Sequence, residues 1–395
     1  MFIVLLFVLS IIGSIISQLP SFVQEGGGDL LKVVWVLPFT FMLFKKPKEY
    51  LHNSLSMFFA LFFVFGGYCI AMEAVTGTPY IGSDIRNILI SCLITVVSYK
   101  FWLNYGSAKT VSLISLVTLI TCVVLAYIIN RDFLSQVDVQ EHYYAYSSKN
   151  SVSSILFCSV ILSLFVFFSK FKWKKILIFV FVAYLIYIIM ILKSRATIAG
   201  FAFVLYYFIF KSHNKRVIYL SILLTIIGIL LILSTPSLYQ TIVEGIVLAG
   251  RDADDLNDVS SGRIYLINEG LVMLFDGFWF GQGNMYLDCM PPVMLLQYGV
   301  FGASIIFIFL FSLAKKVSSL TKTNDINIVT FLLFYCYIIN SIFEAQPPFG
   351  PGVKCFILWM MIGFSFAEIK RHHMLLKKEG SLYDDFAKNR IKGLQ

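Results

Sequence analysis

Long apolar runs recur along almost the whole chain and constrain its fold more than any other feature. A helix needs about 20 mostly apolar residues to cross the hydrocarbon core of a bilayer. The sequence contains twelve runs of approximately this kind, separated by polar segments. They cover residues 2–18, 30–44, 54–75, 86–104, 109–129, 152–169, 175–193, 196–211, 217–234, 292–314, 326–344 and 352–369. The pattern predicts an all-α, polytopic integral membrane protein with about twelve transmembrane helices.

The composition agrees with a membrane location and excludes several soluble classes. Charged residues make up 13% of the 395 residues and hydrophobic residues 58%, whereas a soluble domain has about 25% charged residues. Too few polar side chains remain to cover a soluble protein of this size. We therefore exclude a cytosolic enzyme, a secreted disulfide scaffold and a disordered chain. The seven cysteines form no C-x-x-C pair and no metal-ligand spacing, so no metal site is expected.

The basic residues predict how the chain lies across the membrane. Of the 31 Lys and Arg, 22 fall on one set of alternate connecting segments and 9 on the other. By the positive-inside rule, both termini are then cytoplasmic. The outer side holds 16 of the 22 acidic residues. The net charge of +9 therefore comes from the basic cytoplasmic side and serves to orient the chain in the membrane. No nucleic-acid partner is expected. We expect a single membrane domain over 1–395 with a basic cytoplasmic tail over 370–395.

The outer loop over 235–291 is the longest segment between predicted spans. Loops of this length in compact proteins are usually functional or disordered, and this one is too hydrophobic for disorder. Within it, Arg263–Phe275 is predicted to form a short amphipathic helix on the membrane surface, with Ser260 and Ser261 as capping residues. Arg263 would stand near the N-terminus of that helix, where backbone amides favour an anion.

Arg195 is a second candidate for contact with an anion. Lys193, Ser194 and Arg195 form almost the whole connection between the seventh and eighth runs, so Arg195 must lie near the outer membrane boundary. It either extends to water from a helix end or faces the bundle and holds a phosphate. A guanidinium suits the second role, because it donates two parallel hydrogen bonds to phosphate oxygens and keeps its charge at any working pH.

Three segments of the second half resemble the O-antigen polymerase and ligase superfamily, membrane glycosyltransferases of the GT-C type. The family's Ser-Arg helix entry is similar to LKSRATIAGFAFVLYYFI (192–209). Its arginine, short helix and Gly-x-Gly loop resemble SGRIYLINEGLVMLFDGFWFGQG (261–283). Its long apolar residues followed by Gly-x-x-Gly resemble VMLLQYGVFGASIIFIF (293–309). The order and spacing of these motifs carry the resemblance, which covers about residues 175–370.

The resemblance implies a substrate, a location and a set of site residues. The family uses an oligosaccharide linked to undecaprenyl diphosphate at the periplasmic face of the bacterial inner membrane, and the lipid diphosphate leaves when the glycan is transferred. Arg195 and Arg263 match the family's outer arginines, which are thought to hold the diphosphate. Arg251 is a third candidate, although the family pattern does not fix its position. No cofactor is implied. The implied partners are the lipid-linked substrate, membrane lipid, a chain-length regulator and a flippase.

Several residues are candidates for the general base that accepts the proton of the acceptor hydroxyl. The ligase branch has a histidine where this chain has Asp288, counted back from Gly299. Asp288 and Glu269 are the catalytic candidates, and Glu344 and Gln346 remain open alternatives. An acidic residue that only starts a helix is the alternative interpretation of Asp288.

These observations lead us to expect an enzyme, a repeat-unit polymerase of the Wzy type that produces O-antigen, capsular or exopolysaccharide. The missing histidine favours this branch over the ligase, which transfers polysaccharide to lipid A–core. A twelve-span transporter or polysaccharide lipid flippase is the alternative from another class. Such transporters commonly have two similar halves, whereas here only the second half contains a long outer loop.

Overall fold

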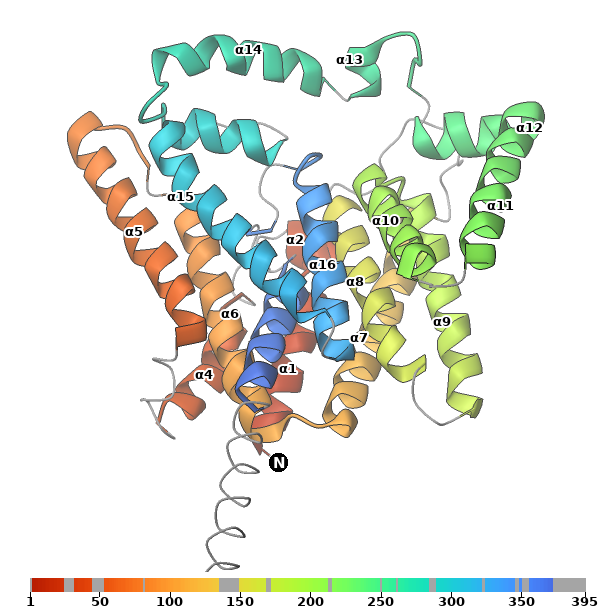
Figure 1. The fold of residues 1–395 in the computed structure, drawn as a ribbon, viewed down its shortest axis with the longest axis horizontal. Helices are drawn as coiled ribbons and strands as arrows, with labels where there is room; N and C mark the ends of the chain where they lie inside the picture. The colour runs from red at the N-terminus through yellow and green to blue at the C-terminus, as the bar shows by residue number, and fades with distance from the viewer. Residues whose placement is uncertain are drawn as a thin grey trace, which may run out of the picture.

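The computed structural model is helical wherever it has regular secondary structure in the described part of the chain. It describes residues 2–24, 32–44, 53–80, 82–134, 149–167, 172–211, 215–248, 251–260, 262–283, 289–321, 324–344, 348–349 and 355–371. Long helices run between an upper and a lower end, and other helical segments lie across the upper end (Figure 1). The prediction of an all-α chain is confirmed for these residues.

Most of the longer helices coincide with the predicted apolar runs, and several shorter ones lie between the runs. The first half contains α1 (Phe2–Ile16), α2 (Pro20–Gln24), a 3₁₀ turn (Lys32–Trp35), α4 (Val36–Leu43), α5 (Asn53–Thr76), α6 (Ser83–Tyr105), α7 (Ala108–Ile129) and a π turn (Asn130–Leu134). The middle contains α8 (Lys149–Phe167), α9 (Lys172–Ile191), α10 (Arg195–Lys211), α11 (Lys215–Ser234), α12 (Pro236–Leu238) and the π-helix η4 (Tyr239–Val247). The last part contains α13 (Leu256–Val259), α14 (Arg263–Asp276), α15 (Met290–Leu320), α16 (Asp325–Asn340) and a helix over 356–371.

Four of these helices are long and apolar enough to cross a membrane by themselves. They are Leu55–Thr76, Ile85–Tyr105, Ala108–Leu134 and Met290–Leu320. A fifth span results if Ile218–Ser234 and Pro236–Val247, which meet at 98°, count as one broken crossing. The described residues therefore contain four or five membrane-length helices, and twelve crossings are not reached. The reason is length, because a helix such as α1, with 15 residues, spans only about 22 Å of a core that is about 30 Å thick.

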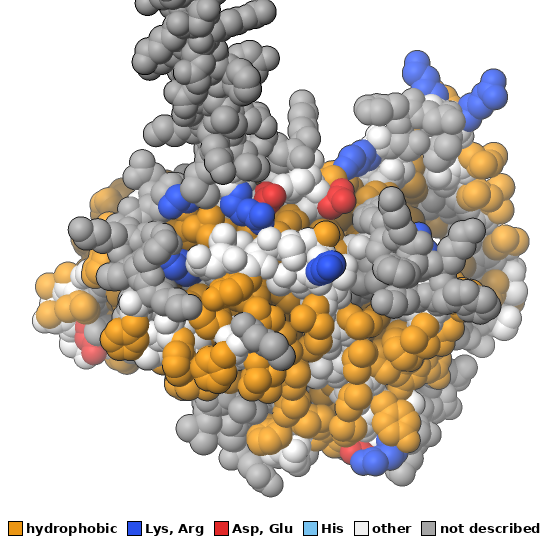
Figure 2. All heavy atoms as spheres, turned by 90° about the horizontal axis from the view of Figure 1, so that it is seen from below, with side chains coloured by type: hydrophobic (Ala, Val, Ile, Leu, Met, Phe, Trp, Pro, Cys, Tyr) orange, Lys and Arg blue, Asp and Glu red, His pale blue; other side chains and the backbone are white. Residues whose placement is uncertain are grey.

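The helix surfaces also suit a membrane protein of several spans. On α11, the side chains of Leu220, Leu224 and Leu231 are each more than half exposed, at 57%, 58% and 54%. Apolar surface of this extent marks contact with lipid or with another protein. At the lower end, Figure 2 shows Lys and Arg side chains gathered over the helix ends, with apolar side chains around them.

Aromatic side chains fill the interior at the lower half of the bundle. Phe7 of α1 stacks on Phe101 of α6 with ring centroids 3.9 Å apart, and Phe364 packs beside both. The indole N–H of Trp35 donates to the hydroxyl oxygen of Ser14 over 2.9 Å. This pairing satisfies a buried donor that would otherwise be costly to bury. The first helix is thereby tied into the core.

The helix α15 is broken at Gly299, where φ is +61° and ψ is −173°. This conformation is open essentially to glycine alone. The segment before the break runs across the upper end of the bundle, and the segment after it descends between the other helices (Figure 1). The Gly-x-x-Gly motif of the sequence thus begins at a change of chain direction.

Residues 277–283, which follow α14, pair through their backbone with both sides of this break. The N–H of Gln282 donates to the carbonyl of Leu296 over 2.9 Å, and that of Gly283 donates to Gln297 over 3.0 Å. In the other direction, the N–H of Val300 donates to the carbonyl of Phe278 over 2.9 Å, and that of Phe301 donates to Trp279 over 3.2 Å. We call this pairing of residues 277–283 with 296–301 the glycine clasp.

Two tyrosines join the glycine clasp to the N-terminal half of the chain. The hydroxyl of Tyr68 on α5 lies 2.9 Å from the carbonyl oxygen of Phe280 and 2.6 Å from that of Tyr298. The hydroxyl of Tyr80 donates to the carbonyl of Gly281 over 2.8 Å. The C-terminal end of α14 is therefore held in place by α5, by the segment that follows α5 and by α15.

We predict that Gly281→Ala and Gly299→Ala each lower the thermal stability of the protein. A Cβ atom at Gly281 would lie 2.3 Å from the Gln297 carbonyl oxygen, and one at Gly299 would lie 2.4 Å from the Phe280 nitrogen. Backbone strain of this kind costs on the order of 1–3 kcal/mol per site. Thermal unfolding of the purified protein in detergent measures the loss.

The matched control is Gly228→Ala on α11, where a Cβ atom would meet nothing within 4 Å. This variant should unfold at or slightly above the wild-type temperature, because alanine is the better helix former. If all three variants unfolded at the same temperature, the glycine clasp would not contribute to stability.

Candidate functional site

The connection between α9 and α10 is as short as the sequence predicted. Lys193 is buried, with 7% of its surface exposed, and has a left-handed backbone with φ of +52°. Ser194 is also buried, and its hydroxyl lies 3.1 Å from that of Thr197 in the first turn of α10. Arg195 is the first residue of α10 and is half-buried, and its guanidinium donates to the carbonyl of Val259. Arg195 thus contacts the segment over 235–291, which we call the upper loop.

The structure contains the predicted surface helix as α14, Arg263–Asp276, and places it across the upper end of the bundle (Figure 1). Its first N–H groups are satisfied as expected for a capped helix. The N–H of Ile264 donates to the hydroxyl of Ser260 over 3.2 Å, and that of Tyr265 donates to the side-chain oxygen of Asn257 over 3.1 Å. Arg263 is half-buried and donates to the carbonyl of Ser260 over 3.3 Å. Ser261, the other predicted cap, lies outside the described residues.

Each of the three predicted arginines lies close enough to Lys149 to act on its charge. Lys149 is the first residue of α8, just before the apolar run 152–169, and it is partly buried. Burial lowers the pKa of Lys149 to about 7, with further lowering by the positive charges of Arg251, Arg195 and Arg263. Charges act in this way only over short distances. We call Lys149, Arg195, Arg251 and Arg263 the cation cluster.

Glu344 is a carboxylate that lies close to Lys149 of the cation cluster. It follows α16, and its negative charge acts on Lys149 in the opposite direction from the arginines, raising the pKa. The side-chain amide of Asn150 donates a hydrogen bond to its carboxylate. Glu344 was one of the open alternatives for a general base, and its place beside Lys149 favours it among them.

A polar layer continues below this carboxylate, between α8 and α16. The amide nitrogen of Asn340 donates to the hydroxyl oxygen of Ser154 over 3.1 Å, and both residues are buried. The amide oxygen of Asn340 is also buried and has no hydrogen-bond partner within the described ranges. A buried acceptor of this kind is costly unless a ligand or water reaches it. The layer therefore offers polar contacts next to the cation cluster.

The remaining catalytic candidates differ in position from Glu344. Glu269 is exposed on α14 and accepts a hydrogen bond from the hydroxyl of Tyr265 one turn earlier, which raises the pKa of that tyrosine. Asp288 and Gln346 lie outside the described residues. The described part of the chain thus places one of the four candidates at the cation cluster and another on the exposed face of the surface helix.

The cation cluster has the composition of a site for a polyanion. Four positive side chains, from α8, α10, α14 and residue 251, lie close to one another, Glu344 acts on Lys149, and all five residues are partly buried. Partial burial strengthens charge interactions relative to open water. Guanidinium groups bind phosphate oxygens bidentately, and lysine adds a point charge. Among the described residues, no group of three His, Cys, Asp or Glu side chains could hold a metal ion.

Two parts of this site could not be found from the sequence. Lys149 follows an outer loop, far along the chain from the arginines, and it belongs to no motif. Asn340 lies within an apolar run and resembles an ordinary helix residue. Only the packing of α8 against α16 reveals that these side chains adjoin the predicted site.

The chain matches no known protein-family model and no curated protein.

Because Lys149 has a pKa of about 7, we predict that anion binding at the cation cluster weakens as pH rises. The lysine is charged below this pKa and neutral above it, and a bound anion raises the pKa by stabilising the ammonium. Binding should therefore take up a proton at and just above pH 7. Titration calorimetry with inorganic pyrophosphate between pH 6 and 9, in two buffers of different ionisation enthalpy, measures both effects.

Pyrophosphate itself changes protonation state between pH 6 and 9. The contribution of Lys149 is therefore obtained by comparing the pH dependence of binding between the wild type and variants. Lys149→Gln should bind more weakly at pH 6 and lose part of the pH dependence. Lys215→Gln, at an exposed lysine at the start of α11, should behave as the wild type. An unchanged pH dependence in Lys149→Gln would exclude Lys149 from the binding site.

Proposed function

We propose that this chain is a membrane glycosyltransferase that polymerises oligosaccharide repeat units carried on undecaprenyl diphosphate. The product would be an O-antigen, a capsular polysaccharide or an exopolysaccharide, made at the periplasmic face of the bacterial inner membrane. The observation that carries the proposal is the convergence of Arg195, Arg251 and Arg263 on Lys149.

The chemistry needs positive charge where the lipid leaves. As the bond between the sugar's anomeric carbon and the diphosphate oxygen breaks, its electron pair moves to the diphosphate. Cations already in place stabilise that charge more than water would, because they need not reorganise. In this proposal the cation cluster holds the diphosphate in both the ground state and the transition state, and the gain in rate comes from the stronger contact in the latter.

The acceptor hydroxyl must lose a proton as its oxygen attacks the anomeric carbon. We assign this step to Glu344, because it is the candidate base whose charge acts on Lys149 of the cation cluster. Asn150 would orient it through their hydrogen bond. The proton passes from the acceptor oxygen to the Glu344 carboxylate, and the new glycosidic bond replaces the bond to the diphosphate.

The same proposal includes the predicted topology of twelve crossings with both termini on the cytoplasmic side. The basic lower end (Figure 2) supports this orientation, since positive residues favour the cytoplasmic side. The surface helix α14 then lies at the periplasmic face. The basic tail over 370–395 falls almost entirely outside the described residues.

We predict that Arg195→Ala and Arg263→Ala remove most polymer while the protein inserts at normal levels. A charge-assisted hydrogen bond is worth about 1.5–3 kcal/mol, so each change should reduce the rate at least about tenfold. The lysine variants should also lose most activity, because an ammonium cannot form the bidentate contact. Glycan chain length, made by purified protein from lipid-linked repeat units, is the measurement.

Arg86→Ala is the matched control, since Arg86 is an exposed arginine of α6. It should keep full activity. If both lysine variants were fully active, the cation cluster would not bind the diphosphate through guanidinium geometry. Failure to lengthen glycans, together with movement of lipid-linked sugar across vesicle membranes, would exclude the polymerase and favour a flippase.

A deletion strain separates the polymerase from the ligase. Loss of a polymerase leaves single repeat units on lipid A, which gel electrophoresis resolves. Loss of a ligase leaves none, and lipid-linked polymer accumulates. We expect the first pattern.

The topology gives a further prediction for cysteine labelling in whole cells. All seven native cysteines are buried, so a new exposed cysteine should dominate the signal. A membrane-impermeant maleimide should label Glu244→Cys, which lies on η4 at the upper end, in intact cells. It should label Lys109→Cys, at the start of α7, only after the inner membrane is permeabilised. The reverse pattern would invert the proposed orientation.

A further inference from the structure

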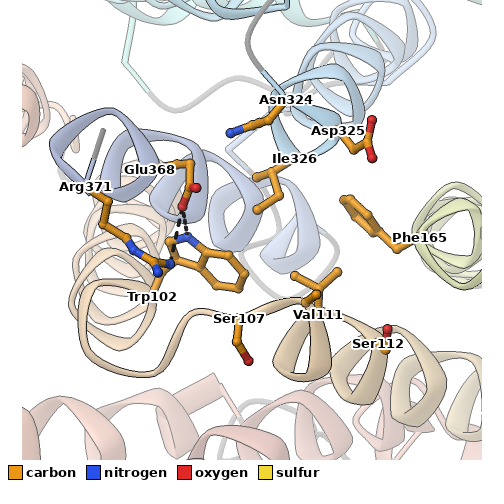
Figure 3. A pocket seen from close by; sticks show the side chains of 11 residues that line it. Trp102, Ser107, Val111, Ser112, Phe165, Asn324, Asp325, Ile326, Glu368 and Arg371 are labelled. Carbon is orange, nitrogen blue, oxygen red and sulfur yellow. Dashed lines mark hydrogen bonds and ion pairs between the residues drawn. The ribbon is translucent and has the colours of Figure 1, made fainter. Parts of the chain in front are cut away.

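A separate cavity of about 440 Å³ lies at the lower end of the bundle. It is enclosed by the ends of α6, α7, α8 and α16 and by the end of the helix over 356–371 (Figure 3). Its volume lies within the usual range of small-ligand sites, about 300–1,000 Å³. The cavity lies at the start of α7, at the lower end, whereas α14, whose first residue is Arg263 of the cation cluster, lies across the upper end (Figure 1).

The walls of the cavity divide into an apolar and a polar part. Trp102, Val111, Phe165 and Ile326 supply the apolar surface. The polar lining consists of Ser107, Ser112, Asn324, Asp325, Glu368 and Arg371. A ligand that fills this space therefore needs both an apolar portion and a polar, charged portion.

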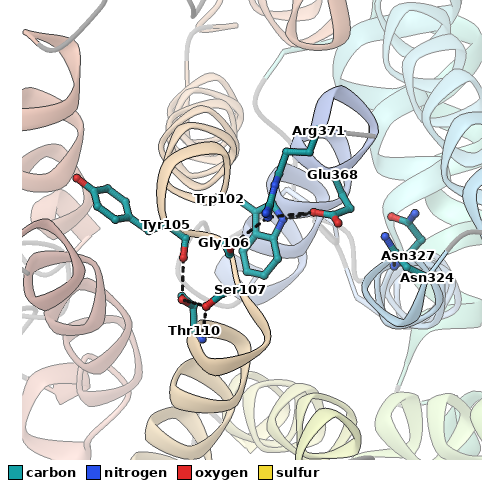
Figure 4. A network of polar contacts seen from close by, with 9 residues as sticks. All are labelled: Trp102, Tyr105, Gly106, Ser107, Thr110, Asn324, Asn327, Glu368 and Arg371. Atoms are coloured by element: carbon teal, nitrogen blue, oxygen red, sulfur yellow. Dashed lines mark hydrogen bonds and ion pairs between the residues drawn. The ribbon is translucent and has the colours of Figure 1, made fainter. Parts of the chain in front are cut away.

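The guanidinium of Arg371 is held firmly at one side of the cavity (Figure 4). It donates to the carbonyl of Gly106 over 3.0 Å and lies 3.5 Å from the carboxylate of Glu368. The indole N–H of Trp102 donates to the same carboxylate over 2.6 Å. A Cβ atom at Gly106 would lie 2.7 Å from the Arg371 nitrogen, so glycine is what allows the guanidinium to approach the turn. A cation fixed in this way is preorganised for a ligand.

The charges that line the cavity do not cancel. Arg371 is paired with Glu368, which leaves the negative charge of Asp325 on another wall (Figure 3). Asp325 is the first residue of α16, and Asn324 caps that helix by accepting from the N–H of Asn327 over 2.9 Å. The helix start is thus satisfied without the Asp325 side chain. The cavity thus presents the Arg371–Glu368 pair on one wall and the carboxylate of Asp325 on another.

We propose that this cavity binds the headgroup of a zwitterionic phospholipid with a primary ammonium. The phosphate would lie against Arg371 and the hydroxyl of Ser107, the ammonium against Asp325, and the acyl chains along Val111, Phe165 and Ile326. Basic pockets between transmembrane helices bind anionic lipid headgroups. The lining here has one cation and two carboxylates, which favours a headgroup that also carries a positive charge. An anionic headgroup without an ammonium leaves Asp325 without a counter-charge. A trimethylated ammonium cannot donate a hydrogen bond to Asp325.

Native mass spectrometry of the full-length protein in detergent tests this assignment. The probes are phosphatidylethanolamine, phosphatidylglycerol and phosphatidylcholine with the same short acyl chains. We expect the wild type to bind phosphatidylethanolamine about two- to fivefold better than the other two, the range of a partly exposed ion pair. Equal binding of the three lipids would overturn the proposal.

Asp325→Asn is the decisive variant, because Asn324 still caps α16 when Asp325 is changed. It should bind phosphatidylethanolamine no better than phosphatidylglycerol. Glu244→Gln, at the opposite end of the bundle, is the matched control and should keep the wild-type preference. Retention of that preference by Asp325→Asn would overturn the assignment.

Arg371→Gln should weaken phosphatidylethanolamine and phosphatidylglycerol alike, because both carry the phosphate. Since Arg371 also supports the turn at Gly106, thermal unfolding of each variant identifies any loss that comes from unfolding. Pyrophosphate binding at the cation cluster should be unchanged in all of these variants. Selective loss of phosphatidylethanolamine in Arg371→Gln would contradict a phosphate contact.

Discussion

The glycine clasp fixes the upper loop, and the arrangement of the candidate site depends on that loop. Main-chain hydrogen bonds hold residues 277–283 against the break at Gly299, and two tyrosines hold the same residues from the N-terminal half. With its C-terminal end secured there, α14 can lie across the bundle and not extend into solvent. Its N-terminal end then carries Arg263 to the region reached by α8 and α10.

The cation cluster itself is an unfavourable arrangement that the rest of the fold must sustain. Three arginines and a lysine repel one another, and partial burial reduces the screening by water. Burial lowers the pKa of Lys149 most, and the repulsion by the three arginines lowers it further. Contacts from Arg195 to Val259 and from Arg263 to Ser260 hold the guanidinium groups in place despite the repulsion. An arriving anion would relieve that repulsion, so the fold stores part of the free energy of binding in advance.

The sequence predicted the parts of this protein that follow local physical rules. Apolar runs of the right length became helices, and the amphipathic segment after Ser260 became α14, because both depend only on nearby residues. The arginines could be selected because charge near a membrane boundary is rare and costly. Lys149, Asn340 and the lower cavity could not be predicted. They depend on which helices pack together, and a single sequence does not contain that information.

The number of membrane crossings is another property that the sequence alone did not determine. Hydropathy counts apolar runs whether they are long enough for a straight crossing or not. Helices such as α1 and α16 are apolar but short, and tilt, partner helices and flanking residues decide how short helices are accommodated. These are properties of the assembled protein in its bilayer.

The break in α15 divides the helix into two parts whose side chains meet different environments. Residues after Gly299 must be apolar, because a polar side chain in the hydrocarbon core would make insertion into the membrane unfavourable. Residues before it lie across the upper end and are released from that requirement. They accommodate two consecutive prolines in the first turn and a buried glutamine, Gln297. Substitutions in this upper segment can therefore reshape the surroundings of the site during evolution while the ability of the chain to enter the membrane stays the same.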